Sequence, residues 1–400
     1  MALNLFKKIG KGFSTLEFRY IRNRAKRYGY ILQGRQPEKA DTIFIENYFR
    51  TNYKKNALLS YLIYPFISDI LNNHSNHREC FTMAEILNEL EYNVDVIHWN
   101  NTTYVPVKAY DLVIDNHNNL ERLSPNLPAA CKRIFHATNA HWLYQNKVEY
   151  ERYYGFYVKT GMALEPIRQI SKGNSVQYAD AISMFGNEFT ASTYPLFKKK
   201  IQHLPMSVNT GVELLSKNFN QAKRKFVWLN SHGALLKGLD VVLDAFAVSD
   251  QLELYICGNL EKEHAFMSAI EKNLARSSNV KQVGWVDMES EDFKNLIREC
   301  AFVINSSFSE GGGGSALNCM AKGLIPILSQ SASITLPPNT GFYLENNNGI
   351  CLKAVIDMVS LLPGDRLMEM SKNAHSFVAA NHTLQNFRDK YKEFVTNITA

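Results

Sequence analysis

The sequence alternates short apolar runs with helical patterns, and it does so in two separate series. The first series comprises Thr42–Ile45, Leu58–Tyr64, Val94–His98, Leu112–Ile114, Ile134–Ala137 and Ala181–Phe185. The second comprises Phe226–Leu229, Leu252–Cys257, Val280–Val283, Ala301–Asn305 and Ile325–Leu328. Strands that alternate with helices form parallel sheets covered on both faces, so two series predict two doubly wound α/β domains.

The helical patterns and the spacing of the runs divide the chain. Helices are predicted at Glu79–Glu91, Leu239–Ala247, Ala265–Ala275, Asp292–Arg298 and Thr383–Phe394, the last with Thr383 as N-cap. The junction between the domains is predicted near Pro205–Asn220. The expected units are an arm at residues 1–40, an N-terminal domain at 41–208, a C-terminal domain at 209–382 and a last helix at 383–400.

The composition excludes several classes of protein. With 46% hydrophobic and 20% charged residues the chain has enough apolar material for packed cores. Its six cysteines form no C-x-x-C pair, which argues against a disulfide scaffold or a cysteine zinc site and predicts a reducing, cytoplasmic compartment. No run reaches the ~18 apolar residues of a membrane span, and the start of the sequence does not read as a secretory signal.

Positive charge is concentrated at the start of the sequence. Residues 1–40 hold ten Lys or Arg against two Glu, a balance of +8, whereas the whole chain sums to +6. Five apolar residues recur there at helical spacing, namely Phe6, Ile9, Phe13, Leu16 and Tyr20. A cationic amphipathic helix suits an anionic membrane surface, and a basic tail packed on the main body is the alternative. Nucleic acid is not an expected partner, because the rest of the chain is slightly acidic and has no reader motif.

Four consecutive glycines, Gly311–Gly314, follow the run Ala301–Asn305 and precede a predicted helix at Ala316–Lys322. Each glycine costs a helix or strand up to ~1 kcal/mol relative to alanine, so four together indicate a backbone that a ligand approaches closely. Ser315 is the expected N-cap, and a helix N-terminus suits an anion such as a diphosphate. Glu310 is expected to accept hydrogen bonds from sugar hydroxyls; complementing the helix dipole is its alternative role.

A second loop, Asn230–Asp240, also connects a predicted strand to a predicted helix. Lys237 and Gly238 come directly before that helix, where a positive charge is unfavourable unless an anion offsets it. We expect Lys237 and His232 to bind the same anion as the glycine run. An exposed surface lysine and an ordinary loop histidine are the alternatives.

Taken together, the Lys237-Gly238 turn, the Val283-Gly-Trp-Val286 segment and the Ser309-Glu-Gly loop resemble the C-terminal domain of retaining GT-B glycosyltransferases, the glycogen-synthase-like and mannosyltransferase-like group often called glycosyltransferase family 4. The resemblance is specific over about Phe226–Pro326, and over residues 57–205 it rests on the order and spacing of elements. It implies two Rossmann-like domains that face each other across a cleft, with the nucleotide-sugar donor bound mainly by the second.

The resemblance also implies roles for single residues. The first glutamate of the family's E-x7-E pattern falls on Glu310, and the second, which usually binds the ribose, falls on Asn318. The family's arginine and lysine on the diphosphate fall on His232 and Lys237, and Val286 lies where the base meets the backbone. The implied donor-binding residues are His232, Gly233, Lys237, Val286, Glu310, Gly312, Gly313, Gly314, Ser315 and Asn318.

The acceptor side is expected to come from the first domain. His74 and His77 follow the run Leu58–Tyr64, and His136 lies at the end of another predicted strand. By resemblance, histidines at comparable places line the acceptor side or touch the donor sugar, and a structural role is the alternative for each. The predicted catalytic residues are Glu310, Lys237 and His136. Three further cations are interpreted as a solvated face in preference to a site for an acceptor phosphate, namely Arg152, Lys159 and Arg168.

These observations predict a glycosyltransferase of hexosyltransferase type that moves a sugar from a nucleotide-sugar to a glycan or lipid-linked acceptor, with retention. The nucleotide-sugar is a co-substrate, no cofactor is expected, and no metal is expected because the sequence has no D-x-D triplet. The product would belong to polysaccharide or glycolipid synthesis at the inner face of a membrane. Two alternatives stay open: a nucleotide-sugar epimerase of the same architecture, and a non-catalytic nucleotide-sugar-binding protein.

Overall fold

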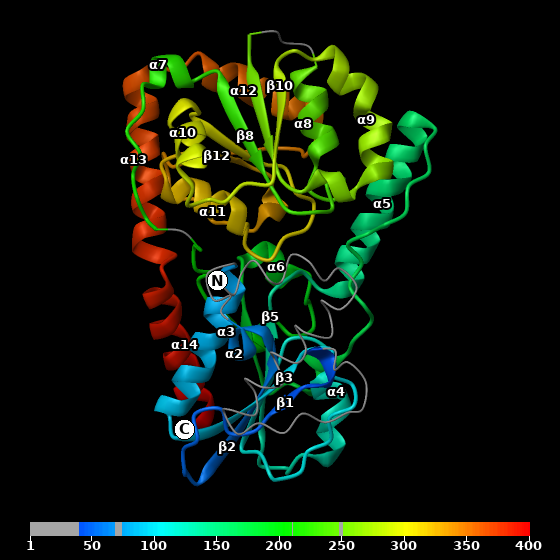
Figure 1. The fold of residues 1–400 in the computed structure, drawn as a ribbon, viewed down its shortest axis with the longest axis vertical. Helices are drawn as coiled ribbons and strands as arrows, with labels where there is room; N and C mark the ends of the chain where they lie inside the picture. The colour runs from blue at the N-terminus through cyan, green and yellow to red at the C-terminus, as the bar shows by residue number, and fades with distance from the viewer. Residues whose placement is uncertain (1–39, 69–73, 210, 248–250) are drawn as a thin grey trace, which may run out of the picture.

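The computed structural model describes residues 40–68, 74–209, 211–247 and 251–400, so the helix predicted within the basic arm lies outside the described residues. Two sheets lie one above the other, each with helices on both sides (Figure 1). The predicted class, α/β with two Rossmann-like doubly wound domains that face each other across a cleft, is confirmed.

The N-terminal sheet has seven strands in the order β1-β3-β2-β4-β5-β6-β7, and all neighbours are parallel except β1 and β3. Its strands are β1 (Phe44–Ile45), β2 (Lys55–Tyr61), β3 (Tyr92–His98), β4 (Leu112–Asp115), β5 (Lys132–Ala137), β6 (Ala181–Met184) and β7 (Ile201–His203). Its helices are α2 (Tyr64–Ile67), α3 (Ser75–Glu89), α4 (Asn119–Leu123), α5 (Trp142–Thr160) and α6 (Glu188–Ser192). The predicted run Leu58–Tyr64 overshoots β2, because Pro65 starts helix α2 there.

The C-terminal sheet has six strands in the order β10-β9-β8-β11-β12-β13, all parallel to their neighbours. Its strands are β8 (Lys225–Leu229), β9 (Glu253–Cys257), β10 (Val280–Gly284), β11 (Phe302–Asn305), β12 (Ile325–Leu328) and β13 (Phe342–Tyr343). The helices of this half are α7 (Phe219–Ala222), α8 (Leu239–Phe246), α9 (His264–Arg276), α10 (Glu291–Glu299), α11 (Gly314–Ala321), α12 (Gly349–Ser360) and α13 (Gly364–Asn381). One core packs α8, α9 and α12 on the sheet, and a second packs α10, α11 and α13 on its other face.

Each sheet has one place where the strand order reverses direction. In the C-terminal sheet the chain leaves β8 toward β9 and β10, and leaves β11 toward β12 and β13, so the reversal lies between β8 and β11. In the N-terminal sheet the reversal lies between β2 and β4. Open α/β sheets bind ligands at such switch points, at the carboxyl ends of the strands.

The last helix, α14 (Leu384–Thr399), returns to the N-terminal domain. Thr383 Oγ1 accepts a hydrogen bond from the backbone N–H of Asn386 at 3.1 Å, as predicted for an N-cap. Four buried side chains of α14 enter the core under the N-terminal sheet, namely Phe387, Tyr391, Phe394 and Val395. Arg388 on α14 pairs with Glu85 on α3 at 3.1 Å. The chain passes between the domains twice, once after β7 and once between α13 and α14.

Helix α5 projects from the N-terminal domain along the side of the C-terminal one (Figure 1). Tyr153 and Phe156 of α5 belong to the core of the C-terminal sheet. The chain then runs back along α5, and we call residues 142–170 the α5 arm. Its returning part is held by α5 side chains: Asn146 exchanges two hydrogen bonds of 2.8 Å with the backbone of Ile170. This arm was not predicted from the sequence.

No helix in the described ranges is long and apolar enough to cross a bilayer. All six cysteines are free, and five of them are buried.

Candidate functional site

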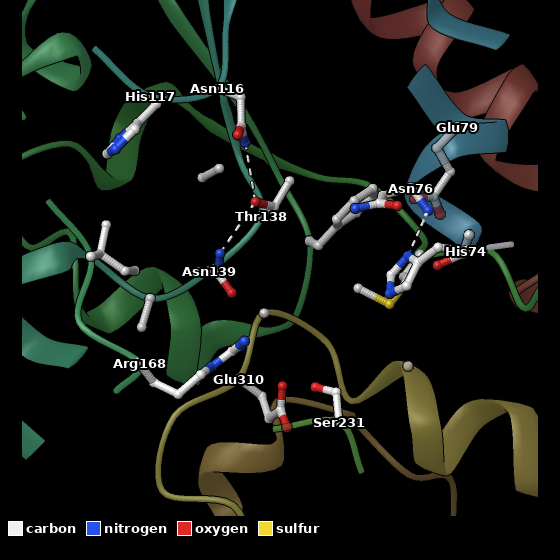
Figure 2. Close-up of a pocket in the computed structure, with 18 of the residues that line it drawn as sticks. His74, Asn76, Glu79, Asn116, His117, Thr138, Asn139, Arg168, Ser231 and Glu310 are labelled. Carbon is white, nitrogen blue, oxygen red and sulfur yellow. Dashed lines mark hydrogen bonds between the residues drawn. The ribbon is translucent and has the colours of Figure 1, made fainter. Parts of the chain in front are cut away.

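A cleft of about 680 Å³ lies between the domains, at the carboxyl ends of both sheets (Figure 2). The loops after β8 and β11 form one wall, and the loops after β2, β4 and β5 form the other. The predicted site residues that line it are His74, Lys237, Glu310, Gly313, Gly314, Ser315 and Asn318. The predicted residues that are not part of its lining are His77, His136, His232, Gly233, Val286 and Gly312.

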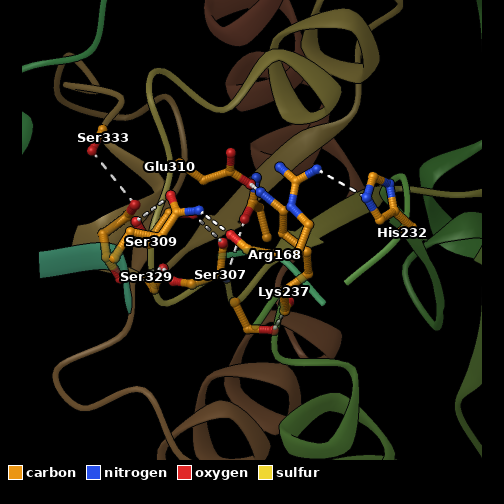
Figure 3. Close-up of polar contacts among 12 residues, drawn as sticks. Arg168, His232, Lys237, Ser307, Ser309, Glu310, Ser329 and Ser333 are labelled. Carbon is orange, nitrogen blue, oxygen red and sulfur yellow. Dashed lines mark hydrogen bonds and ion pairs between the residues drawn. The ribbon is translucent and has the colours of Figure 1, made fainter. Parts of the chain in front are cut away.

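Lys237 and Glu310 form a buried ion pair at the switch point of the C-terminal sheet (Figure 3). Lys237 Nζ lies 2.5 Å from Glu310 Oε1, and the two side chains are only 5% and 14% exposed. Burial lowers the pKa of Lys237, and the Glu310 carboxylate opposes that shift. The alternative of an exposed surface lysine is therefore wrong.

The tetraglycine loop serves two purposes in the structure. A Cβ on Gly311 would lie 1.8 Å from the carbonyl oxygen of Thr138, so this glycine lets the backbones of the two domains touch. Gly313, with φ of 60°, is the N-cap of α11, and the helix starts at Gly314. The prediction of Ser315 as N-cap is therefore wrong, because a left-handed glycine ends the loop two residues earlier. The first N–H groups of a helix lack partners within it, and those of α11 lie along the cleft.

Asn318 lies one turn into α11 and uses its amide to hold the backbone around it. Its Oδ1 accepts from the N–H of Asn209 in the interdomain connection at 2.9 Å, and its Nδ2 donates to the carbonyl of Gly314 at 2.8 Å. Asn318 lines the cleft and is 5% exposed.

The loop after β8 is supported by a carboxylate that the sequence analysis did not single out. Glu263 is 6% exposed and accepts from the N–H groups of Gly233 at 2.5 Å and Ala234 at 3.1 Å. The N–H of Gly233 is therefore engaged within the protein. His232 does not line the cleft, and its Nε2 lies 3.5 Å from Arg168 Nη1. Burial together with the charges of Arg168 and Lys237 lowers its pKa.

His136 lies near the end of β5 and is fully buried beside two aromatic rings. Its Nδ1 lies 2.9 Å from Ser183 Oγ, and its ring packs against Tyr61 and Phe185. Burial lowers its pKa to about 3, so the ring is neutral. Because His136 does not reach the cleft, we assign it a packing role in place of the predicted catalytic one.

The N-terminal wall of the cleft carries aromatic and neutral polar side chains. His74 is the N-cap of α3, where its Nδ1 accepts from the N–H of Asn76 at 3.2 Å, and His77 lies in the first turn of that helix. Burial lowers the pKa of His74 and of His117 on the same wall. Trp99 packs on His117 with ring centroids 4.8 Å apart. The sequence analysis missed Trp99 and His117 because neither belongs to a local motif.

Glu79 is the most unusual group of this wall. It is fully buried on α3, and its Oε1 accepts from the N–H of Ser207 at 2.6 Å and from its hydroxyl at 2.9 Å. Its Oε2 has no hydrogen-bond partner among the described residues. Burial raises the pKa of Glu79 to about 7, the hydrogen bonds to Ser207 opposing the shift.

The three cations interpreted as a solvated face have different surroundings. Arg152 pairs with Asp240 at 2.5 Å, and Lys159 pairs with Asp244. Arg168 is half-buried and lines the cleft, with its guanidinium beside Lys237 and Glu310 (Figure 3). The interpretation of Arg168 as part of a solvated face is wrong, because the α5 arm folds back onto the C-terminal domain.

Residues 213–377 match the family described as "Glycosyl transferases group 1". The matched segment contains Lys237, Glu310 and the tetraglycine loop, so the resemblance to group 1 glycosyltransferases is confirmed.

Solved structures share the fold over most of the chain. Sucrose-phosphate synthase from Thermosynechococcus elongatus has a TM-score of 0.58 at 13% identity, over 86% of this chain and 98% of the other. A glycosyltransferase from Rickettsia africae ESF-5 has a TM-score of 0.55 at 14% identity, over 86% and 99%. HepE from Anabaena, solved in complex with UDP-glucose, has a TM-score of 0.54 at 12% identity, over 86% and 99%. The chain therefore has the two-domain GT-B fold of glycosyltransferases.

Proposed function

We propose that this protein is a glycosyltransferase of hexosyltransferase type that transfers a sugar from a nucleotide-sugar donor to a glycan or lipid-linked acceptor, with retention and without a metal. One observation carries the proposal: the buried Lys237–Glu310 pair lies in the same cleft as the N-terminus of α11, at the switch point of the C-terminal sheet. The UDP-glucose complex of HepE, which shares the fold, supports a donor of this class.

Lys237 is suited to stabilise the departing nucleoside diphosphate. An ammonium group has three donors, and the ion pair with Glu310 occupies one of them. The N–H groups at the start of α11 add the positive end of a helix dipole. Donors fixed in place before the reaction stabilise charge that develops on a leaving group, and losing one costs about 10²–10³ in rate.

Glu310 is suited to the donor sugar. An ionised carboxylate only accepts hydrogen bonds, so it repels phosphate oxygens and favours hydroxyl groups. With one oxygen on Lys237, the other is available to a sugar hydroxyl. The pair thus marks where the diphosphate ends and the sugar begins.

The opposite wall suits a neutral, hydroxyl-rich acceptor. Its histidines are held neutral by burial, and its tryptophans offer flat apolar faces. Such a wall fits sugar rings, whose faces are apolar and whose edges carry hydroxyl groups.

The same proposal includes contact of residues 1–40 with the cytoplasmic side of an anionic membrane. Co-sedimentation with vesicles, comparing the full chain with a variant that lacks these residues, tests this contact.

The transferase proposal is tested by a panel of nucleotide-sugars, first for thermal stabilisation and then for turnover with and without glycan acceptors. A ligand that binds the folded protein raises its melting temperature by mass action. We expect one donor to stabilise the protein, and transfer to need an acceptor, to persist in EDTA and to give a product with the donor's anomeric configuration. Conversion of the donor alone would identify an epimerase, and binding without any turnover would identify a non-catalytic binding protein.

A further inference from the structure

Two cations line the C-terminal wall of the cleft, with His232 next to one of them, and they come from different parts of the chain. Lys237 and His232 belong to the loop after β8, whereas Arg168 belongs to the α5 arm of the N-terminal half (Figure 3). Lys237 has an ion-pair partner in Glu310. Arg168 has no ion pair within 4.0 Å among the residues that the structure describes.

The backbone of Arg168 is fixed by two buried side chains of α5. Glu149 Oε1 accepts from the N–H of Arg168 at 2.5 Å and from that of Ile167 at 2.9 Å. Gln145 Nε2 donates to the carbonyl oxygen of Arg168 at 2.6 Å. The arm is in turn docked on the C-terminal domain, where the Arg152 guanidinium pairs with Asp240 and lies 3.9 Å from the centre of the Phe308 ring. Arg168 therefore lies at a defined place beside the loop after β11.

The side chain of Arg168 runs across the loop after β8. Gly233 makes room for it, because a Cβ there would lie 2.3 Å from Arg168 Cγ. The guanidinium reaches His232, whose Nε2 lies 3.5 Å from Nη1. Arg168 Nε is buried and has no hydrogen-bond partner among the described residues. A guanidinium has five donors in a rigid fork, so most of them remain for a ligand.

The electrostatics of this wall favour an anion. Burial lowers the pKa of Lys237 and that of His232, and the positive charge of Arg168 lowers both pKa values further. Glu310 pairs with Lys237. Two further carboxylates near Arg168, those of Glu149 and Glu263, accept hydrogen bonds from backbone N–H groups. A dianionic ligand between Arg168 and Lys237 would replace their repulsion with attraction.

A second unpartnered donor lines the same cleft. Asn230, directly after β8, is 5% exposed, and its Nδ2 is buried without a hydrogen-bond partner among the described residues. Buried polar atoms in native proteins are almost always hydrogen-bonded, so the unpartnered nitrogens of Arg168 and Asn230 in one cleft indicate a polar ligand.

We propose that Arg168, carried by the α5 arm, binds the diphosphate of the nucleotide-sugar donor together with Lys237, so that the N-terminal half of the chain supplies the second phosphate-binding cation. The proposal rests on the proposed function and adds a residue to it that lies outside the matched family segment, residues 213–377. Guanidinium groups bind phosphate with two parallel hydrogen bonds, which fits this position.

The test is calorimetric titration of the full-length protein with UDP, GDP and ADP, and with uridine, guanosine and adenosine as phosphate-free probes. Four proteins are compared: the unchanged chain, Arg168→Ala, Arg168→Lys and Lys172→Ala. Lys172 is a suitable control because it is exposed, follows the α5 arm by two residues and does not line the cleft. Melting temperatures without nucleotide show whether each variant is folded.

For the nucleotide that the unchanged protein binds, we expect Arg168→Ala to weaken diphosphate binding about 10- to 100-fold, which is the range for a hydrogen-bonded charge. Binding of the matching nucleoside should stay unchanged. Arg168→Lys should lie between the two, because a lysine keeps the charge without the fork, and Lys172→Ala should bind like the unchanged protein.

Several results would overturn the proposal. Unchanged diphosphate affinity in Arg168→Ala would remove the role outright. An equal loss for diphosphate and nucleoside would mean that Arg168 only supports the fold, and a higher acceptor KM at unchanged diphosphate affinity would place it on the acceptor. If the unchanged protein bound none of the diphosphates, the proposed function would fail as well. If it bound a diphosphate equally well without Arg168, only the role of Arg168 would be contradicted, and the proposed function would remain.

Discussion

The two walls of the cleft differ in their charge and in how they are built. The C-terminal wall places a buried ion pair, a second cation and a helix N-terminus at one switch point. The N-terminal wall has neutral histidines, tryptophans and amides around the end of α3. Under the proposed function, the first wall binds a ligand that carries charge, and the second binds a ligand that presents hydroxyl groups and apolar faces.

This difference matches what the proposed sugar transfer requires. When the bond between the sugar and the diphosphate breaks, a further negative charge develops on the diphosphate, and fixed cations in a buried site stabilise that charge strongly. The acceptor supplies a hydroxyl group, which loses its proton as the new bond to the sugar forms, so no charge remains on the acceptor. We therefore expect substitutions on the C-terminal wall to act on the reaction rate, and those on the N-terminal wall to act on acceptor binding and stability.

The largest effect is expected for Lys237→Ala. Removing this cation should lower the rate of transfer by about 10²–10³, because it removes a fixed donor to the leaving group. Steady-state kinetics with saturating donor measures the loss, and a melting curve checks the fold. A rate within threefold of the unchanged protein would contradict the assigned role of Lys237.

On the other wall, Glu79→Gln should change how stability depends on pH. Burial raises the pKa of Glu79 to about 7, so the folded protein holds a proton that the unfolded chain releases between its usual pKa near 4.5 and 7. Stability should therefore fall as the pH rises through this window. The glutamine variant lacks the titration, so we expect it to match the unchanged protein near pH 4 and to exceed it near pH 8 by up to about 3 kcal/mol.

Urea unfolding of both proteins at the two pH values measures this difference. The variant side chain would keep an oxygen for the N–H and hydroxyl of Ser207, which makes Glu79→Gln a close neutral match. A stability difference between the two proteins that does not change with pH would show that Glu79 is not the titrating group.

A smaller effect on the transfer rate should distinguish the first and the last of the four glycines. In Gly311→Ala the new Cβ would lie 1.8 Å from the Thr138 carbonyl oxygen, so the contact between the walls must open. In Gly314→Ala it would lie 3.0 Å from the flexible end of Met206. We expect Gly311→Ala to lower transfer by about tenfold, as displaced reacting groups do, and Gly314→Ala to lower it less. Equal effects on turnover would show that the contact between the domains does not matter for the reaction.

The smallest effect concerns His74, which both caps α3 and lines the cleft. His74→Ala should cost about 1 kcal/mol of stability, and His74→Asn should restore it, because asparagine is a good N-cap. If His74 also touches the acceptor, both variants should raise the acceptor KM. Recovery of both stability and KM in the asparagine variant would leave His74 with a capping role alone.

The sequence predicted the C-terminal wall better than the N-terminal one, for physical reasons. Strand β11, the tetraglycine loop and α11 follow one another directly, so local patterns of apolar residues and glycines reveal them. Lys237 and Gly238 are adjacent and come directly before a helix, so this pair could likewise be identified from the local sequence. Even here the N-cap was misplaced by two residues, because a glycine with positive φ replaced the expected serine.

The N-terminal wall and the α5 arm depend on contacts between distant parts of the chain. His136 was predicted to reach the cleft, but the order of residues along a strand does not reveal that Tyr61 and Phe185 enclose its ring. Arg168 was predicted to be solvated. The sequence did not reveal its true position, because only the docking of α5 on the other domain brings Arg168 to Lys237. The αL C-cap at Gly161 was a local signal that a long helix ends there.

The central claim is that Lys237 and the start of α11 hold the diphosphate of a nucleotide-sugar. A crystal structure of the protein with the nucleoside diphosphate it binds tests this claim most directly. Our account predicts phosphate oxygens within hydrogen-bond distance of Lys237 Nζ and of the first N–H groups of α11, roughly 2.7–3.2 Å. A diphosphate bound away from both, with Lys237 still paired only to Glu310, would contradict it.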